Sequence, residues 1–303
     1  QQQAAAHRQA LANAWMGTFG KIWPVLEHAI VKHGGDEDVM EEIMRCSKNA
    51  MQAMNLAFRD FLAPFATACV NAFMRHPMSC VLYAVTTLVS VFGKDAQYVQ
   101  PLCDMCGALG GKTFEILSQP NAFTQRPDIV TEFFELIGRG VRRFPRAILS
   151  SPFADTAFQC ACASMYTDLQ HRESLHSLLT YFDNIASADA NEHNQALLAE
   201  DRQFAAQFLM SPGNSPGETR GGQMCKAMLH ALVTKPSVCV EPVAAGCLSL
   251  KRLIPQQCEA WLGEGLQALG PEVPNEARRR FMQDMVTATN SKSAKEATRG
   301  LYR

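Results

Sequence analysis

No stretch of this sequence sustains the two-residue alternation of apolar and polar side chains that is typical of a half-buried strand. Apolar residues recur instead at helical spacing almost everywhere, and the short breaks between these segments carry Gly, Pro or Asp. We therefore expect helices over residues 4–17, 22–33, 36–56, 58–75, 79–92, 101–117, 128–143, 152–167, 172–187, 190–208, 217–234, 241–253, 255–269, 275–288 and 293–302.

The spacing of these helices indicates a repeat architecture. Two helices with their turns come to about forty residues, which is the period of HEAT and armadillo arrays. The segment 79–92 is apolar nearly all round, as expected of an inner helix between neighbouring repeats. The sequence therefore predicts an all-α fold, a HEAT-repeat superhelical solenoid of antiparallel helix pairs; a globular helical bundle is the alternative. We expect a single array over residues 1–303.

One long polar break, SPGNSPGETRGG, suggests a flexible inter-helix loop at about 211–222. The alternative interpretation is a regulated hinge, with a phosphosite at Ser211 or Ser215. The sequence alone leaves both interpretations open.

The sequence also lacks the common catalytic patterns. It contains no P-loop, no GxGxxG and no GxSxG nucleophile elbow, and its eight histidines are scattered. Helical solenoids offer long faces to other macromolecules more often than deep catalytic clefts. We therefore expect a binding protein rather than an enzyme, without a cofactor.

Cysteine is plentiful, but a second metal-ligand pair is missing. Cys103 and Cys106 form the one CxxC of the eleven-cysteine sequence, and no second CxxC or HxxxH completes a zinc site. We expect these two thiols to be reduced, metal-free and packed in a helix. A chain of this length and core content needs no disulfide framework, so the implied compartment is reducing, the cytosol or the nucleus.

The net charge of the chain is also low, and its apolar runs are short. The formal net charge is −1, which argues against direct nucleic-acid binding by the whole molecule. The longest uncharged apolar run, residues 79–92, is too short to span a bilayer, so we expect no membrane insertion. The first residues lack a methionine and the layout of a signal peptide, and we expect a piece of a longer protein.

Against this background the segment GRGVRRFPRAILSS is unusual, because it contains four arginines within eight residues and no acid. On a helix, an apolar stripe would be buried, and it is made of Val130, Phe133, Phe134, Ile137 and Val141. The opposite side would carry Arg139, Arg142 and Arg143 together with Glu132 and Glu135. Pro145 is expected to end this helix or to open the next one.

The arginines themselves are Arg139, Arg142, Arg143 and Arg146. Glu135 precedes Arg139 by four residues, a favourable pair, but Arg139 and Arg143 form a like-charge pair at the same spacing. This surplus of positive charge does not stabilise a helix that has no binding partner. The segment therefore predicts an anion-binding helix, with a solvated face as the alternative. A second basic run, residues 278–280, points in several directions and is interpreted as surface.

Several stretches resemble the carboxy-terminal, cargo-side part of the transportin-3 (transportin-SR) branch of the importin-β superfamily. They cover most of residues 20–187 and the last turn, and match that branch in the right order. The stretches are KIWPVLEHAIVKHGGDEDVMEEIMRC, HPMSCVLYAVTTLVSVFG, QPNAFTQRPDIVTEFFELIGRGVRRFPRAILSS, DLQHRESLHSLLTYFDNI and ATRGLYR.

The resemblance implies a nuclear import receptor that shuttles between cytoplasm and nucleus. Its cargo would be splicing factors with phosphorylated Arg-Ser-rich (SR) tails, released by Ran-GTP, and it would also contact nucleoporins. Ran-GTP would bind mainly through an amino-terminal half that this chain lacks.

The resemblance also implies that Arg139 and Arg143, which match the arginine-lined helix of that branch, hold phosphoserines. From their place in the sequence we expect Arg142, and Arg146 as a lesser contributor, to bind the same phosphoserines on the concave face. Glu135 stands where the resemblance leads us to expect a further arginine. The alternatives are an importin-13-like bidirectional receptor with other cargo, and a HEAT-repeat scaffold of an enzyme complex.

Overall fold

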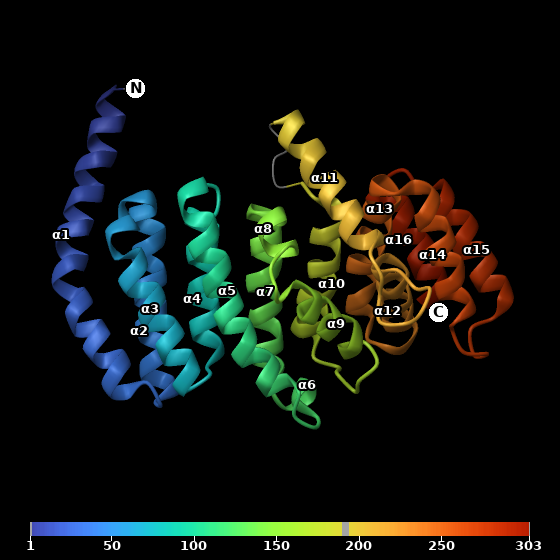
Figure 1. Cartoon of the computed structure of the whole chain (residues 1–303), viewed down its shortest axis with the longest axis horizontal. Helices are drawn as coiled ribbons and strands as arrows, with labels where there is room; N and C mark the ends of the chain where they lie inside the picture. Colours follow the sequence, from blue (N-terminus) through green and yellow to red (C-terminus); the bar gives the residue numbers. More distant parts are fainter. Residues whose placement is uncertain (1, 190–193, 303) are drawn as a thin grey trace. The chain divides into compact units, whose positions relative to one another are not determined.

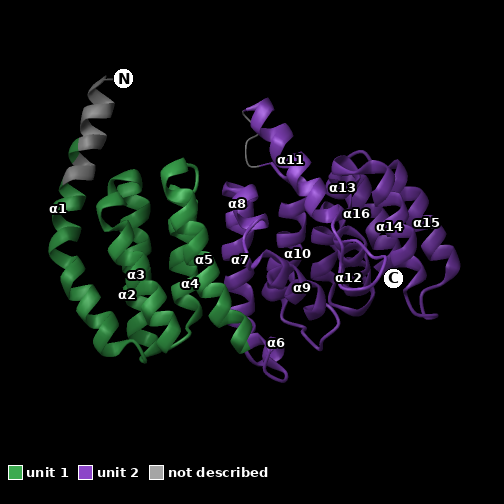
Figure 2. Cartoon of the chain, in the orientation of Figure 1, with its two compact units in different colours: residues 1–116 green, residues 117–303 purple. Residues whose placement is uncertain are grey.

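The structure, a computed structural model, describes residues 2–189 and 194–302. It is 82% helical, and the described residues contain no strand. The fold is an all-α, HEAT-like solenoid, which confirms the predicted fold class. The chain divides into two compact units, residues 1–116 and 117–303 (Figure 2). The expectation of one array over the whole chain stays a prediction.

The first unit consists of helices that follow one another with short turns (Figure 1). Its elements are α1 (Gln2–His33), α2 (Glu37–Met54), the 3-10 helix η1 (Asn55–Phe58), α3 (Arg59–Arg75), α4 (Ser79–Phe92) and α5 (Ala96–Leu117). Helix α4 has the predicted bounds, and among its residues only Tyr83 is exposed. The apolar character of this helix therefore corresponds to burial, since seven of its fourteen residues are buried and six more are partly buried.

The amino-terminal part of this unit corrects one prediction. A single helix, α1, replaces the two expected over 4–17 and 22–33, and it contains Pro24. Gly17 and Gly20 lie inside it, because a glycine costs a helix only about 1 kcal/mol and does not by itself end it. Phe19 and Trp23 of α1 are buried, and their rings meet those of Phe58 and Phe65 at centroid distances of 5.2 and 5.8 Å. This aromatic cluster fixes α1 on α3.

The second unit contains the remaining helices. They are α6 (Ala122–Gln125), α7 (Pro127–Arg143), α8 (Pro145–Leu149), α9 (Ala154–Ser164), α10 (Arg172–Ser187), α11 (Gln195–Met210), α12 (Arg220–Thr234), the 3-10 helix η2 (Ser237–Cys239), α13 (Val240–Leu253), α14 (Pro255–Gln267), α15 (Asn275–Thr287) and α16 (Ser291–Tyr302). The helix predicted over 190–208 begins with residues 190–193, which lie outside the described residues.

Helices α7, α10 and α13 form one layer of this unit, with α10 in the middle. The amide of Asn184 donates to the carbonyl of Gly138 at 3.3 Å, and Ser249 donates to Asp183 at 2.6 Å. Near the other ends of α7 and α10, Ser174 contacts Pro127. The three helices therefore run parallel, and their carboxyl ends share one edge of the layer. Helix α16 packs beside α13.

The segment 211–222 forms a small hairpin. An isolated antiparallel bridge joins Pro212 to Thr219, and the N–H of Arg220 donates to the carbonyl of Ser211 at 2.9 Å. The Arg220 side chain binds Asp155 at 2.9 Å and lies over the ring of Phe208. The flexibility expected of this loop stays a prediction.

The hairpin runs into α12 at two glycines that lie under Trp261. A Cβ atom built on Gly221 would come within 2.2 Å of the Trp261 ring, so only glycine allows α14 to approach this closely. Among the helices that the structure describes, none combines the length and the apolar composition needed to cross a membrane.

Candidate functional site

The candidate site lies on α7, whose sequence fixes both its ends and its orientation. Pro127 opens the helix, Asp128 lies in its first turn, and Arg142 and Arg143 lie in its last turn, which suits the helix dipole. The predicted apolar stripe is confirmed, because its five side chains are all at most 1% exposed. The face that is left carries the arginines.

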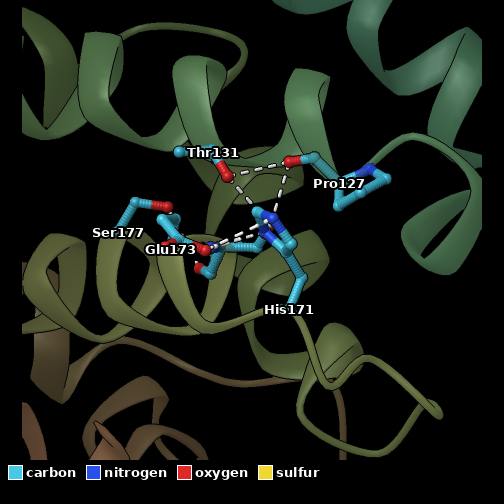
Figure 3. A network of polar contacts seen from close by, with 6 residues as sticks. Pro127, Thr131, His171, Glu173 and Ser177 are labelled. Carbon is cyan, nitrogen blue, oxygen red and sulfur yellow. Dashed lines mark hydrogen bonds and ion pairs between the residues drawn. The ribbon is translucent and has the colours of Figure 1, made fainter.

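The amino-terminal part of α7 is tied to α10 by a polar network (Figure 3). The Ser174 hydroxyl lies 2.9 Å from the Pro127 carbonyl and 2.9 Å from the Thr131 hydroxyl, and Thr131 donates to Pro127 at 2.8 Å. His171 caps the start of α10 by accepting from the N–H of Ser174 at 3.3 Å. Together with the bond between Asn184 and Gly138, these contacts hold α7 at both ends.

The carboxyl end of α7 is set by Phe144 and Pro145. Pro145 is the first residue of α8, so it both ends α7 and opens the next helix, as the sequence predicts. Helix α8 folds closely over the end of α7, since a Cβ on Gly140 would lie 2.9 Å from the Ile148 side chain. This break separates Arg146 from the three arginines before it.

Arg139, Arg142 and Arg143 form no ion pair with any of the residues that the structure describes. The Nε atoms of Arg139 and Arg143 are buried and have no hydrogen-bond partner. Burial lowers the pKa of Arg143 below its usual value, and the charges of Arg139 and Arg142 lower it further. The favourable pair expected between Glu135 and Arg139 is likewise not among the ion pairs of the described residues, so α7 carries even less compensation than its sequence suggests.

The carboxylate of Asp183 on α10 lies at this edge of the layer, close to Arg142. Burial raises the pKa of Asp183 and the charge of Asp189 raises it further, while the hydrogen bond from Ser249 and the positive charges of Arg142 and Arg252 act against that rise. Arg142 therefore has a negative neighbour without a direct ion pair. Of the three α7 arginines, Arg139 and Arg143 therefore have the positive charges with the least compensation.

Arg146 has a different environment. Its guanidinium binds Glu200 at 2.8 Å and Asp201 at 3.0 Å, both on α11, and the Asp201 side chain is 1% exposed. The structure thus uses Arg146 to hold α11 against α8. An anion bound by the α7 arginines would therefore have to compete with these two ion pairs for Arg146.

The second basic run, 278–280, is interpreted from the sequence as surface, but one of its three arginines has a structural role. Arg278 donates to the carbonyls of Leu266, Leu269, Gly270 and Val273, at 2.9, 3.0, 2.6 and 3.1 Å. It therefore satisfies the carboxyl end of α14, a role that the sequence interpretation missed because the acceptors are backbone groups. Its neighbours Arg279 and Arg280 are exposed and pair with acids of their own helix, as a solvated face does.

Cys103 and Cys106 are buried in α5, at 4% and 0% exposure. None of the eleven cysteines, which all lie in the described residues, forms a disulfide, and these residues contain no group of three or more His, Cys, Asp or Glu side chains placed to hold a metal ion. The expectation that Cys103 and Cys106 are reduced and metal-free stays a prediction.

Comparisons with known proteins find similarity mainly to transportins and importin-13. Residues 16–117 match the family described as the Transportin-3/Importin-13 fourth TPR domain. Transportin MOS14 of Arabidopsis thaliana is 23% identical over 264 residues, which cover 87% of this chain and 26% of the relative. The uncharacterized protein C11G11.07 of Schizosaccharomyces pombe is 23% identical over 170 residues, 55% of this chain and 17% of the relative.

Among solved structures, one described as Importin13 cytosolic state matches with a TM-score of 0.70 at 14% identity. The match covers 94% of this chain and 32% of that one, and at this identity it shows the fold alone. Residues 16–117 are therefore similar to the Transportin-3/Importin-13 family, and most of the chain is similar in sequence to a transportin. The chain spans about a quarter of the length of the transportin relative that it matches.

Proposed function

We propose that this chain is part of a nuclear transport receptor that binds phosphorylated Arg-Ser-rich splicing-factor cargo for nuclear import and releases it when Ran-GTP binds. Arg139, Arg142 and Arg143 hold the phosphoserines, and Arg146 contributes less because Glu200 and Asp201 already bind it. The assignment contains no catalytic step, cofactor or nucleic-acid ligand. It includes nucleoporins as partners and shuttling between cytoplasm and nucleus.

One observation carries the proposal: two half-buried arginines one helical turn apart have buried Nε atoms without a hydrogen-bond partner. A buried polar group that lacks a partner costs about 1–3 kcal/mol, and more when it is charged. A bound phosphate would supply that partner. It offers three acceptor oxygens and a charge of about −1.5 to −2, which guanidinium groups match in pairs.

The comparisons support the receptor class and leave the cargo open. The matched family name includes both transportin-3 and importin-13, and the solved structure is an importin-13. A second candidate is therefore an importin-13-like bidirectional receptor with other cargo. The presence of Glu135 on the arginine face of α7 favours this second candidate, because an acid there weakens binding to a densely phosphorylated tail.

The test is a binding titration of the 303-residue chain with a fluorescent peptide of alternating arginine and phosphoserine, against the same peptide without phosphate. We expect the phosphopeptide to bind at least about tenfold more tightly, since each charge-assisted hydrogen bond contributes about 1.5–3 kcal/mol. Arg139→Glu combined with Arg143→Glu should remove this preference. The preference should also decrease with added salt.

The control is Arg279→Glu combined with Arg280→Glu, which changes the net charge equally on exposed positions of α15. It should leave the affinity within about twofold, because these two arginines lie on α15 and not on α7. Circular dichroism melts of both variants verify that the fold is intact. Equal binding of phosphorylated and unphosphorylated peptides would reject the cargo assignment and leave the second candidate.

A further inference from the structure

A cavity of about 560 Å³ lies at the edge of the second unit where α10 and α13 begin, away from the arginines of α7. Its walls come from the first turns of α10, from η2 with the start of α13, and from the last turns of α16. The α7 arginines lie at the opposite edge of the same layer, since α7, α10 and α13 run parallel. The cavity is therefore a second site, independent of the proposed phosphoserine site.

Basic side chains surround this cavity. Arg172 on α10 and Arg299 on α16 line it and form no ion pair with the residues that the structure describes. Lys295 also lines it, and binds Glu241, the one acid of the lining, at 2.6 Å. Lys295 lowers the pKa of Glu241 by its hydrogen bond and its charge, and Arg299 lowers it further. The cavity thus has an excess of positive charge.

Apart from His176 and Ser237, the rest of the lining is apolar. Val238, Val240 and Pro242 form one wall, and the ring of Tyr302, which is 38% exposed, forms another. A single phosphate or chloride ion would leave these apolar walls in water, because the cavity is in the size range of whole small ligands. The walls suit an apolar side chain, and the cations on either side of them suit two acids.

We propose that this cavity binds a short acidic segment of a partner protein, in which carboxylate side chains flank an apolar residue. Arg172 holds an acid on the α10 side, and Arg299 holds one on the α16 side. The apolar residue lies between Val240 and Tyr302. Arginine forks bind carboxylates in pairs of hydrogen bonds, which gives direction as well as affinity.

The test uses the 303-residue chain and a fluorescent, end-capped peptide Glu-Asp-Leu-Asp-Glu, with Gln-Asn-Leu-Asn-Gln as the neutral control. We expect the acidic peptide to bind and the neutral peptide not to bind. Arg172→Glu with Arg299→Glu should weaken the affinity for the acidic peptide at least about tenfold. Tyr302→Ala should weaken it by a smaller factor. Arg279→Glu with Arg280→Glu, the same change in net charge on α15, should leave it within about twofold.

Arg172→Gln with Arg299→Gln gives a milder second variant if the charge reversal disturbs folding, and should also weaken binding. Equal loss in the α15 control, or binding of the neutral peptide, would overturn the proposal. So would displacement of the acidic peptide by inorganic phosphate at equal concentration, because the cavity would then be a site for small anions. Arg139→Glu with Arg143→Glu should not affect this peptide, so a failure here is distinguishable from a failure of the phosphoserine site.

Discussion

Four arginines that are close in sequence have two kinds of surroundings in the structure. Arg139, Arg142 and Arg143 lie before the break at Pro145 and are without ion pairs among the described residues, whereas Arg146 lies just beyond it and bonds to α11. The sequence indicates the surplus of charge, but it cannot show this division. The acids that bind Arg146 are more than fifty residues away, on a different helix.

We expect Arg146→Ala to act mainly on stability. The substitution leaves the Asp201 carboxylate, which is 1% exposed, without its guanidinium partner, so the free energy of unfolding should decrease by about 2 kcal/mol. Affinity for the phosphopeptide should change by less than about threefold. Urea unfolding and the peptide titration measure the two effects.

The matched control for this substitution is Arg202→Ala. Arg202 is exposed, is the next residue after Asp201, and forms no ion pair within the described part of the chain. Its loss should change stability by no more than about 0.5 kcal/mol. If Arg146→Ala weakens phosphopeptide binding as much as Arg139→Glu with Arg143→Glu does, then Arg146 belongs fully to the binding site.

At the scale of elements, helical periodicity predicts most of the fold. The bounds of α4 and α10 agree with the prediction at both ends, because each is bordered by a clear break in the apolar pattern. The split expected within α1 is wrong, because Gly17 and Gly20 do not end the helix, and the packing of Phe19 and Trp23 holds it in place. Contacts between helices, such as the network between α7 and α10, depend on which residues become neighbours in space, so sequence spacing alone could not give them (Figure 3).

The junction of the 211–222 hairpin with α12 gives a prediction at this scale. Gly221→Ala should destabilise the second unit by about 1–3 kcal/mol, because its Cβ would come within 2.2 Å of the Trp261 ring and α14 would have to shift. Thermal unfolding monitored by tryptophan fluorescence measures the loss.

Gly111→Ala on α5 is the corresponding control. A Cβ there meets nothing within 4 Å, so alanine should be neutral or stabilise by up to about 1 kcal/mol. If both substitutions raised stability equally, the close approach of Trp261 to Gly221 would be wrong.

For the whole molecule, the many buried thiols give a prediction for alkaline pH. Burial raises the pKa of Cys239 and of Cys258 to about 12, from an ordinary value of 9.0. The folded state therefore keeps these protons while the unfolded state loses them. The stability from each thiol is fully present below pH 9 and is lost as the pH rises toward 12, by about 1.4 kcal/mol per pH unit.

Urea unfolding between pH 7 and pH 10.5 measures this slope. The double variant Cys239→Ala with Cys258→Ala should show a shallower decline above pH 9 than the unmodified chain, even though its stability at pH 7 is lower. An identical slope in both proteins would show that other groups control the alkaline transition.

The one-turn separation of Arg139 and Arg143 also has a consequence for length. Four residues of a helix advance about 6 Å along its axis, and two residues of an extended chain advance about 7 Å. On the proposed function, a tail that alternates arginine with phosphoserine brings one phosphate to each of the two arginines in step. Helix α7 then recognises the spacing of the phosphates as well as their charge. It measures the interval between modifications in its cargo, so two tails with equal numbers of phosphates, one at every second residue and one at every third, are different ligands.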